Sequence, residues 1–235
     1  MPNSFFRFKQ FVIHQERCAM KVGTDGVLLG AWADLDRATS ILDVGSGSGL
    51  IALMAAQRAP AAIVHAVEID EEACAQAREN IAGSPWPDRV LVFEGAIQQF
   101  QPARHYDAIL CNPPFFVRST PSPRAEKNIA RHCETLTHEE LLEVARRLLA
   151  PGGSLQIILP VAEAERFMQH VADRQWHVNK IAPVLPTPEK APKRVLLLVA
   201  REETPAREET IIIETSRHHY HESYLKLTRD FYLHA

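Results

Sequence analysis

The fold of this chain is decided by the stretch Ile41-Leu42-Asp43-Val44-Gly45-Ser46-Gly47-Ser48-Gly49-Leu50, in which a short apolar run enters a glycine-rich turn. A helical apolar pattern follows over residues 49–58, and the next strand-like run, residues 63–68, ends in Glu68. Glycine lets the backbone turn sharply and approach a ligand closely. The dinucleotide-binding fingerprint has a third glycine where this chain has Leu50, so the turn does not match a pyrophosphate site. An acid at the end of the second strand can accept both hydroxyls of a ribose, so the pattern predicts a half-site for a nucleoside.

Strand-like and helix-like segments alternate along the rest of the chain. Strands are predicted over residues 40–44, 63–68, 90–94, 106–111, 155–159, 177–184 and 194–200, with a short extra strand over 211–214. Helices are predicted over residues 24–32 (capped by Thr24 or Asp25), 49–58, 70–82, 137–149 (opened by a capping box), 161–174 and 222–233. This alternation predicts a right-handed, doubly wound, mostly parallel α/β sheet. Gly45, Glu68 and Asn112 all follow predicted strands, so we expect them at one edge of the sheet, where such folds bind ligands.

A second motif, Asn112-Pro113-Pro114-Phe115, follows the predicted strand 106–111. The side-chain carbonyl of Asn112 can accept a hydrogen bond from an amino group. The Pro113 carbonyl is a candidate second acceptor, because the following proline holds this residue extended. Phe115 offers a flat face for a planar ring. The motif therefore predicts a slot for a planar group with an exocyclic NH2, whose nitrogen lone pair the two acceptors localise as a bond forms.

Composition indicates an ordinary globular protein of 235 residues, 46% hydrophobic and 23% charged. This length fits one α/β domain. No run is long enough for a membrane span and no charged-then-apolar leader opens the chain, so we expect a cytosolic protein. The four cysteines show no C-x-x-C spacing and the eleven histidines form no H-E-x-x-H motif, so no metal site is predicted. The cluster of His218, His219 and His221 is interpreted as solvated or RNA-facing surface, with metal binding as the less favoured alternative.

The formal net charge of −3 argues against a uniformly basic nucleic-acid-binding protein, but the charge is uneven. Residues 1–21 carry four lysines and arginines against Glu16 alone, and residues 115–131 carry four against Glu126 alone. If both segments fold beside the Asn112 slot, they form a basic rim of the kind that binds RNA. The alternative is that these are ordinary solvated side chains.

Taken together, the motifs resemble those of the class I S-adenosylmethionine-dependent methyltransferases. Residues 43–49 match the first cofactor motif, Glu68 the ribose acid, and residues 112–115 the amino-methylating signature. Further stretches are similar to the family of bacterial tRNA1(Val) adenine-N6 methyltransferases, so that the resemblance covers nearly the whole chain; they are residues 8–11, 17–26, 28–32 and 224–233. The resemblance implies a Rossmann-like fold with a mostly parallel, seven-stranded sheet containing one antiparallel strand. It also implies a single methyltransferase domain, in which residues 1–38 cap the cofactor and substrate side of a core formed by residues 39–235.

The resemblance implies roles for individual residues as well. The catalytic residues would be Asn112, Pro113, Pro114 and Phe115. S-adenosyl-L-methionine would be bound by Lys21, Thr24, Asp25, Asp43, Gly45, Ser46, Gly47, Gly49, Glu68, Ile69, Ala96, Ile97 and Asn112. The substrate RNA would contact Arg7, Lys9, Arg118, Arg124, Lys127, Arg131 and Arg194. One departure concerns Ala96, because many relatives carry an acid there for the cofactor adenine. Either the backbone at Ala96 and Ile97 holds the adenine, or cofactor affinity is weaker.

The implied activity is N6-methylation of an adenosine in tRNA, just 3′ of the anticodon of a valine tRNA. A guanine-N2 rRNA methyltransferase and a protein-glutamine N5 methyltransferase present a similar NH2 group to the same slot, so the motif alone does not separate them. Residues 23–26 and the carboxyl-terminal match favour the adenine reading. A catalytically idle RNA-binding module is the non-enzyme alternative. A nicotinamide dehydrogenase fits least, because Leu50 interrupts its fingerprint.

Overall fold

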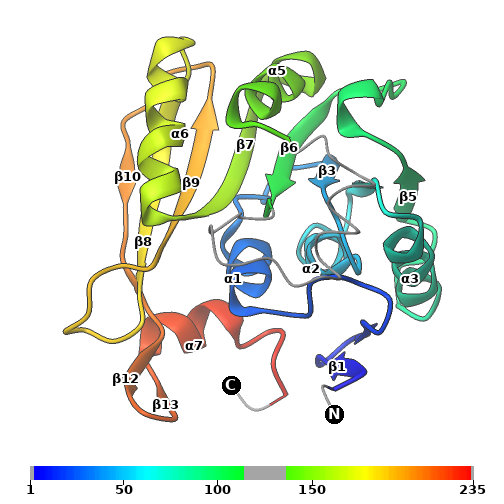
Figure 1. Cartoon of the computed structure of the whole chain (residues 1–235), viewed down its shortest axis with the longest axis horizontal. Helices are drawn as coiled ribbons and strands as arrows, with labels where there is room; N and C mark the ends of the chain where they lie inside the picture. The colour runs from blue at the N-terminus through cyan, green and yellow to red at the C-terminus, as the bar shows by residue number, and fades with distance from the viewer. Residues whose placement is uncertain (1–2, 114–135, 234–235) are drawn as a thin grey trace, which may run out of the picture.

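The computed structural model describes residues 3–113 and 136–233, and a large central sheet forms its core (Figure 1). The long strands lie in the order β8-β9-β7-β6-β3-β4-β5, and the short strands β10 and β11 add to the free edge of β8. The bounds of these strands are β3 Ser40–Val44, β4 Ile63–Glu68, β5 Val90–Glu94, β6 Tyr106–Cys111, β7 Leu149–Pro160, β8 His177–Leu185, β9 Arg194–Ala200, β10 Arg207–Glu208 and β11 Ile211–Ile212. The predicted seven strands are thus present, and two short ones extend the sheet, of which β11 lies within the short extra strand predicted over residues 211–214.

The sheet is parallel except at β9. Strands β7, β6, β3, β4 and β5 pair in parallel, whereas β9 runs antiparallel to both of its neighbours, β7 and β8. Parallel neighbours need a crossover, but β8 and β9 are joined directly by residues 186–193, which permits only an antiparallel return. The predicted doubly wound α/β fold with one antiparallel strand is confirmed.

Helices cover both faces of the sheet (Figure 1). Side chains alternate along each strand, so that Ile41 joins one apolar cluster and Leu42 the other. The first cluster contains residues of α1, α2, α3 and α7, and the second contains residues of α5, α6 and the short 3-10 helix η1. The bounds are α1 Thr24–Trp32, α2 Leu50–Arg58, α3 Glu71–Ala82, η1 Ile97–Gln99, α5 His138–Leu148, α6 Val161–Asp173 and α7 Glu222–Thr228.

Two small antiparallel hairpins lie outside the main sheet. The amino-terminal hairpin pairs β1 (Phe5–Arg7) with β2 (Val12–His14), and the carboxyl-terminal hairpin pairs β12 (Glu214–Ser216) with β13 (His219–Tyr220). Neither hairpin was predicted from the sequence. Their strands have two or three residues, which is too short for an alternating apolar pattern to be recognised.

Two predicted boundaries and one predicted cap were wrong. Strand β7 begins at Leu149 rather than residue 155, because an irregularity in its pairing with β6 lets the Pro-Gly-Gly segment stay in the sheet. Helix α7 ends at Thr228 rather than near residue 233, and the chain then turns to bury Phe231 in the core. Helix α1 is preceded by Gly23 without any side-chain cap, so neither predicted capping residue has that role. The capping box that opens α5 is confirmed, with Thr137 and Glu140 bonded reciprocally.

Within residues 3–113 and 136–233, no helix is long and apolar enough to cross a membrane. The same ranges contain no group of three or more His, Cys, Asp or Glu side chains arranged to hold a metal ion. In the carboxyl-terminal histidine cluster, His221 instead caps α7, because its Nδ1 accepts a hydrogen bond from the Ser223 amide at 3.1 Å.

Candidate active site

Three polar features converge at the carboxyl edge of the sheet, as the sequence predicted. Strands β6, β3 and β4 are adjacent, and the register places Val44 opposite both Val67 and Cys111. The next residues along these strands are Gly45, Glu68 and Asn112. The glycine turn therefore lies between the acid and the amide, and the three come together although far apart in sequence.

The glycine loop has a backbone that only glycine adopts easily. Gly45, Gly47 and Gly49 have φ angles of 69°, 53° and 81°, all in the left-handed region. Two amides at the start of the loop donate to the Val67 carbonyl, at 2.9 Å from Gly45 and 3.2 Å from Ser46. A Cβ atom built on Gly45 or Gly47 would meet nothing within 4 Å among the described residues. Open space thus lies over the loop, where a ligand can approach the backbone.

The Glu68 carboxylate is fixed by backbone amides of two loops. Its Oε2 accepts from the Gly47 amide at 2.8 Å, and its Oε1 accepts from the amides of Ile69 at 2.8 Å and Asp70 at 3.0 Å. These bonds connect the glycine loop to the turn before α3 and set the orientation of the carboxylate. An oxygen with one N–H partner can still accept from a hydroxyl, so Glu68 is suited to hold a ribose.

Glu68→Gln is expected to weaken binding of S-adenosylmethionine about 10- to 100-fold, because a hydrogen bond to a charged group contributes about 1.5–3 kcal/mol. The amide NH2 of Gln also faces N–H donors where a carboxylate oxygen accepted them. The dissociation constant, measured by isothermal titration calorimetry, checks this result. Glu94→Gln is the matched control, because Glu94 lies opposite Glu68 in the register and pairs with Arg78 at 3.5 Å. Equal losses in both variants would contradict the assignment.

Two buried polar atoms near the loop have no partner among the described residues. Asp43 is fully buried, and its Oδ2 accepts from the Ala52 amide at 3.0 Å while its Oδ1 is unpaired. The Ser46 hydroxyl is likewise buried and unpaired. Burial raises the pKa of Asp43 to about 7, and the charge of Glu68 adds to the effect. Unpaired donors and acceptors beside an open glycine loop fit a polar ligand such as a nucleoside with an amino-acid arm.

Asn112 lies half-buried at the end of β6, against helix α1. A Cβ atom on Gly26 would lie 3.0 Å from the Leu50 side chain and 3.8 Å from the Asn112 Nδ2. Glycine at this position therefore lets α1 pack closely on both the slot and the start of α2. Pro113 is also half-buried beside Asn112. The other two predicted slot residues, Pro114 and Phe115, lie outside the described residues.

The remaining predicted residues of the amino-terminal segment form structural bonds. Asp25 in α1 accepts a hydrogen bond from the Arg194 guanidinium at 2.7 Å, which fixes the helix to the first residue of β9. The Lys21 ammonium donates to the Gln15 carbonyl, and the Gln15 side chain accepts from the Val22 amide at 2.7 Å. Thr24 begins α1 without capping it. The structure thus brings Asp25 and Arg194 to the slot side, whereas their contact with cofactor or RNA stays a prediction.

Ala96 and Ile97 lie at the carboxyl side of β5, next to Glu68. The Gly95 amide donates to the Glu68 carbonyl at 2.8 Å, and the Ala96 carbonyl accepts from Gln99 at 3.0 Å as η1 begins. Ile97 is buried, whereas Ile69 is 41% exposed. An exposed isoleucine directly after the ribose acid offers an apolar face for an adenine ring, which fits its predicted place in the cofactor site.

Asn80 was missed by sequence reasoning. It is buried in α3 and bonds the amino-terminal hairpin twice, accepting from the His14 amide at 2.8 Å and donating to the His14 carbonyl at 2.8 Å. Its second amide hydrogen goes to the Ser48 carbonyl of the glycine loop at 2.9 Å. Asn is a poor helix former, but Asn80 lies in the last turn of α3, so the sequence offered only a weak local signal. Asn80 therefore links the hairpin to the loop.

Asn80→Asp is expected to lower the free energy of unfolding by about 1–3 kcal/mol, because a carboxylate cannot donate and would face two carbonyl oxygens. Urea denaturation measures this loss. Gln101→Glu, the same amide-to-acid change at an exposed position, is the control. Because Ser48 belongs to the glycine loop, the dissociation constant of S-adenosylmethionine should also rise. An unchanged unfolding curve would show that the hairpin is held without Asn80.

The predicted RNA-binding residues are dispersed. Arg7 lies on β1, and the Lys9 ammonium donates to the Arg229 carbonyl after α7. Lys9 lines a depression with Arg58 at the far end of α2 from the glycine loop, so it is not part of the slot. The four predicted residues between 115 and 131, which are Arg118, Arg124, Lys127 and Arg131, lie outside the described residues.

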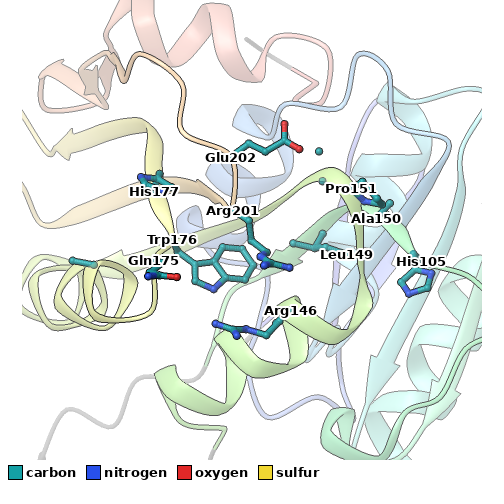
Figure 2. Close-up of a pocket in the computed structure, with 13 residues that line it drawn as sticks. His105, Arg146, Leu149, Ala150, Pro151, Gln175, Trp176, His177, Arg201 and Glu202 are labelled. Carbon is teal, nitrogen blue, oxygen red and sulfur yellow. The ribbon is translucent and has the colours of Figure 1, made fainter.

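A cleft of about 1190 Å³ lies at the other edge of the sheet. Its lining comes from the beginnings of β7 and β8, from the segments before β6 and after β9, and from the last turns of α5 and α6. Figure 2 shows Trp176 at its centre, with the side chains of Arg146 and Arg201 nearby. None of the site residues predicted from the sequence lines this cleft, so it is separate from the candidate active site.

Comparison with known proteins identifies the family. Residues 22–176 match the model of the methyltransferase small domain. The protein named tRNA1(Val) (adenine(37)-N6)-methyltransferase from Parabacteroides distasonis is 43% identical, over 99% of both chains. The protein of that name from Aeromonas hydrophila is 46% identical, over 98% of both. The crystal structure of a predicted O-methyltransferase, Atu636 from Agrobacterium tumefaciens, is 22% identical and superposes with a TM-score of 0.66, covering 88% of this chain and 96% of that one. The chain therefore belongs to the family of tRNA1(Val) (adenine(37)-N6)-methyltransferases.

Proposed function

We propose that this chain transfers a methyl group from S-adenosylmethionine to N6 of the adenosine at position 37, just 3′ of the anticodon, in a valine tRNA. The observation that carries the proposal is the meeting of Asn112, the glycine loop and Glu68 at one edge, in a chain 43–46% identical to enzymes of that name. A tRNA substrate agrees with the predicted cytosolic location.

The cofactor site is formed by the glycine loop, Glu68 and Ile69. The fixed carboxylate of Glu68 would accept from the ribose hydroxyls, and the exposed side chain of Ile69 would offer an apolar face to the adenine. The unpaired Ser46 hydroxyl and Asp43 Oδ1 offer polar contacts beside the loop. When bound, the cofactor supplies an electrophilic methyl group on a sulfonium.

The slot orients the nucleophile. The target base must first leave its stack, because its amino group is not accessible within a stacked loop. The Asn112 side-chain carbonyl and the Pro113 carbonyl accept from the N6 hydrogens, which localises the nitrogen lone pair. Phe115, outside the described residues, is assigned to stack on the ring. Positioning and fixed dipoles provide most of the acceleration, and the proton leaves afterwards from an acidic N6-methylated cation, so no strong base is needed.

Transfer of labelled methyl tests the proposal. The purified protein is incubated with labelled S-adenosylmethionine and, separately, total tRNA, total rRNA and protein extract from a strain that lacks this gene. Mass spectrometry then identifies the modified residue. N6-methyladenosine in tRNA supports the proposal, whereas N2-methylguanosine in rRNA or label in protein glutamine would replace its substrate. Cofactor binding without transfer would favour the idle RNA-binding module.

A further inference from the structure

Two exposed segments lie side by side beyond the carboxyl edge of the sheet. One is the connection between β8 and β9, residues 186–193, and the other is the β12–β13 hairpin, residues 214–220 (Figure 1). The hairpin contacts the first segment directly where the chain leaves its pairing with β8. There the Glu214 amide donates a hydrogen bond to the Pro186 carbonyl at 3.0 Å. We call these two segments the basic strip.

The basic strip is continuous with the Asn112 slot. Arg194, the first residue of β9, follows the first segment and lies opposite Pro160, the last residue of β7. Its guanidinium donates to Asp25 of α1 at 2.7 Å. The next residue along α1 is Gly26, and a Cβ atom built there would lie 3.8 Å from the Asn112 Nδ2. The start of α1 thus lies between the slot and Arg194, next to the strip.

The strip is positively charged in a chain whose net charge is −3. Residues 186–193 contain two lysines against Glu189, and residues 214–220 contain one arginine and two histidines against Glu214, so that lysine and arginine outnumber the acids by three to two. The exposed cations are Lys190, Lys193 and Arg217. None of the three has a carboxylate within 4.0 Å in the part of the chain that the structure describes. They are therefore available for an external anion.

The strip is also preorganised. Three prolines restrict the first segment, and backbone bonds from Lys190 to the Thr187 carbonyl at 3.1 Å and from Lys193 to the Val184 carbonyl at 2.9 Å fix its shape. In the hairpin, Tyr220 is 49% exposed, and its ring centroid lies 5.2 Å from that of Tyr224. A fixed backbone loses little entropy on binding, and an exposed aromatic ring can stack on a base or ribose.

The geometry points to the basic strip as the docking surface for the RNA backbone that flanks the methylated base. This inference rests on the proposed function, because the proposed occupant of the strip is the tRNA whose adenosine enters the Asn112 slot. Lys190, Lys193 and Arg217 neutralise phosphates of the anticodon arm, and Tyr220 packs against the same strand. Binding through phosphates releases counterions, so it carries a defined dependence on salt.

The test replaces all three cations together, as Lys190→Ala/Lys193→Ala/Arg217→Ala. The control, Arg37→Ala/Arg104→Ala/Arg201→Ala, removes the same charge from exposed positions around the opposite edge of the sheet. Filter binding measures the Kd for total tRNA from a strain lacking this gene, at salt concentrations from about 50 to 200 mM. Calorimetry with S-adenosylmethionine confirms that each variant is folded. Methyl transfer to tRNA by the unaltered protein is measured in parallel.

The strip variant is expected to raise the Kd for tRNA about tenfold or more, and to reduce the slope of log Kd against log salt by about 2 to 3. The control should change the Kd less than about twofold, and both should bind S-adenosylmethionine normally. Equal effects in the two variants, or none in the strip variant, would overturn the inference. Absence of methyl transfer by the unaltered protein would overturn the proposed function instead, whereas absence of any tRNA binding would overturn both.

Discussion

Asn112→Ala is expected to lower kcat for tRNA methylation about 10²–10³-fold, because it removes a preorganised acceptor that acts where charge develops in the transition state. The side chain lies at the end of β6 with α1 packed beside it, so its position is set before substrate binds. Glu68 and the glycine loop are untouched by this change. The Kd for S-adenosylmethionine should therefore shift less than about threefold. Single-turnover methyl transfer and calorimetry measure the two quantities.

Asn112→Asp is the matched variant, because it keeps the size of the side chain and its acceptor oxygens but removes the NH2 donor. If Asn112 acts by accepting from N6, the Asp variant should be faster than the Ala variant. Equal losses of rate in the two would assign the effect to the NH2 group, which is the part of Asn112 closest to Gly26. A loss of cofactor affinity as large as the loss of rate would place Asn112 in cofactor binding rather than in the chemical step.

The main features of the fold and site could be predicted from local sequence. Gly45, Glu68 and Asn112 each follow a buried apolar strand, and parallel strands end at the same edge, so their meeting follows from topology. The first residue of each of these strands and the capping box of α5 could also be predicted from the local sequence. Sequence reasoning was sufficient where the role of a residue depends only on its position at the end of its own strand or helix.

Long-range polar contacts could not be predicted in this way. Asn80 bonds His14, 66 residues away, and Arg194 bonds Asp25, 169 residues away. No local pattern distinguishes these side chains from solvated ones, because their partners are chosen by tertiary packing. Asp25 shows the consequence, since its carboxylate reads as a helix cap in the sequence but bonds β9 in the structure. The basic strip was missed for the same reason, because its two segments are brought together by β11 pairing with β8 and by the bond between Glu214 and Pro186.

The protonation state of Asp43 should make the stability of the protein depend on pH. Burial raises the pKa of its carboxyl from 3.8 to about 7 in the folded state. The folded chain then binds a proton that the unfolded chain releases between these two values. The contribution of this group to stability is therefore greatest below pH 3.8, and it is lost as the pH rises through 7.

Asp43→Asn removes this titration. As the pH rises from about 5 to about 8, the free energy of unfolding of the variant is therefore expected to increase by about 2.5 kcal/mol relative to that of the unaltered protein. Urea denaturation of the cofactor-free proteins across this range measures the difference. Asp88→Asn, at an exposed carboxylate, controls for the loss of one acid. A difference that does not vary with pH would mean that Asp43 is already ionised in the fold. Its Oδ1, which has no partner among the described residues, would then carry buried negative charge without a donor there.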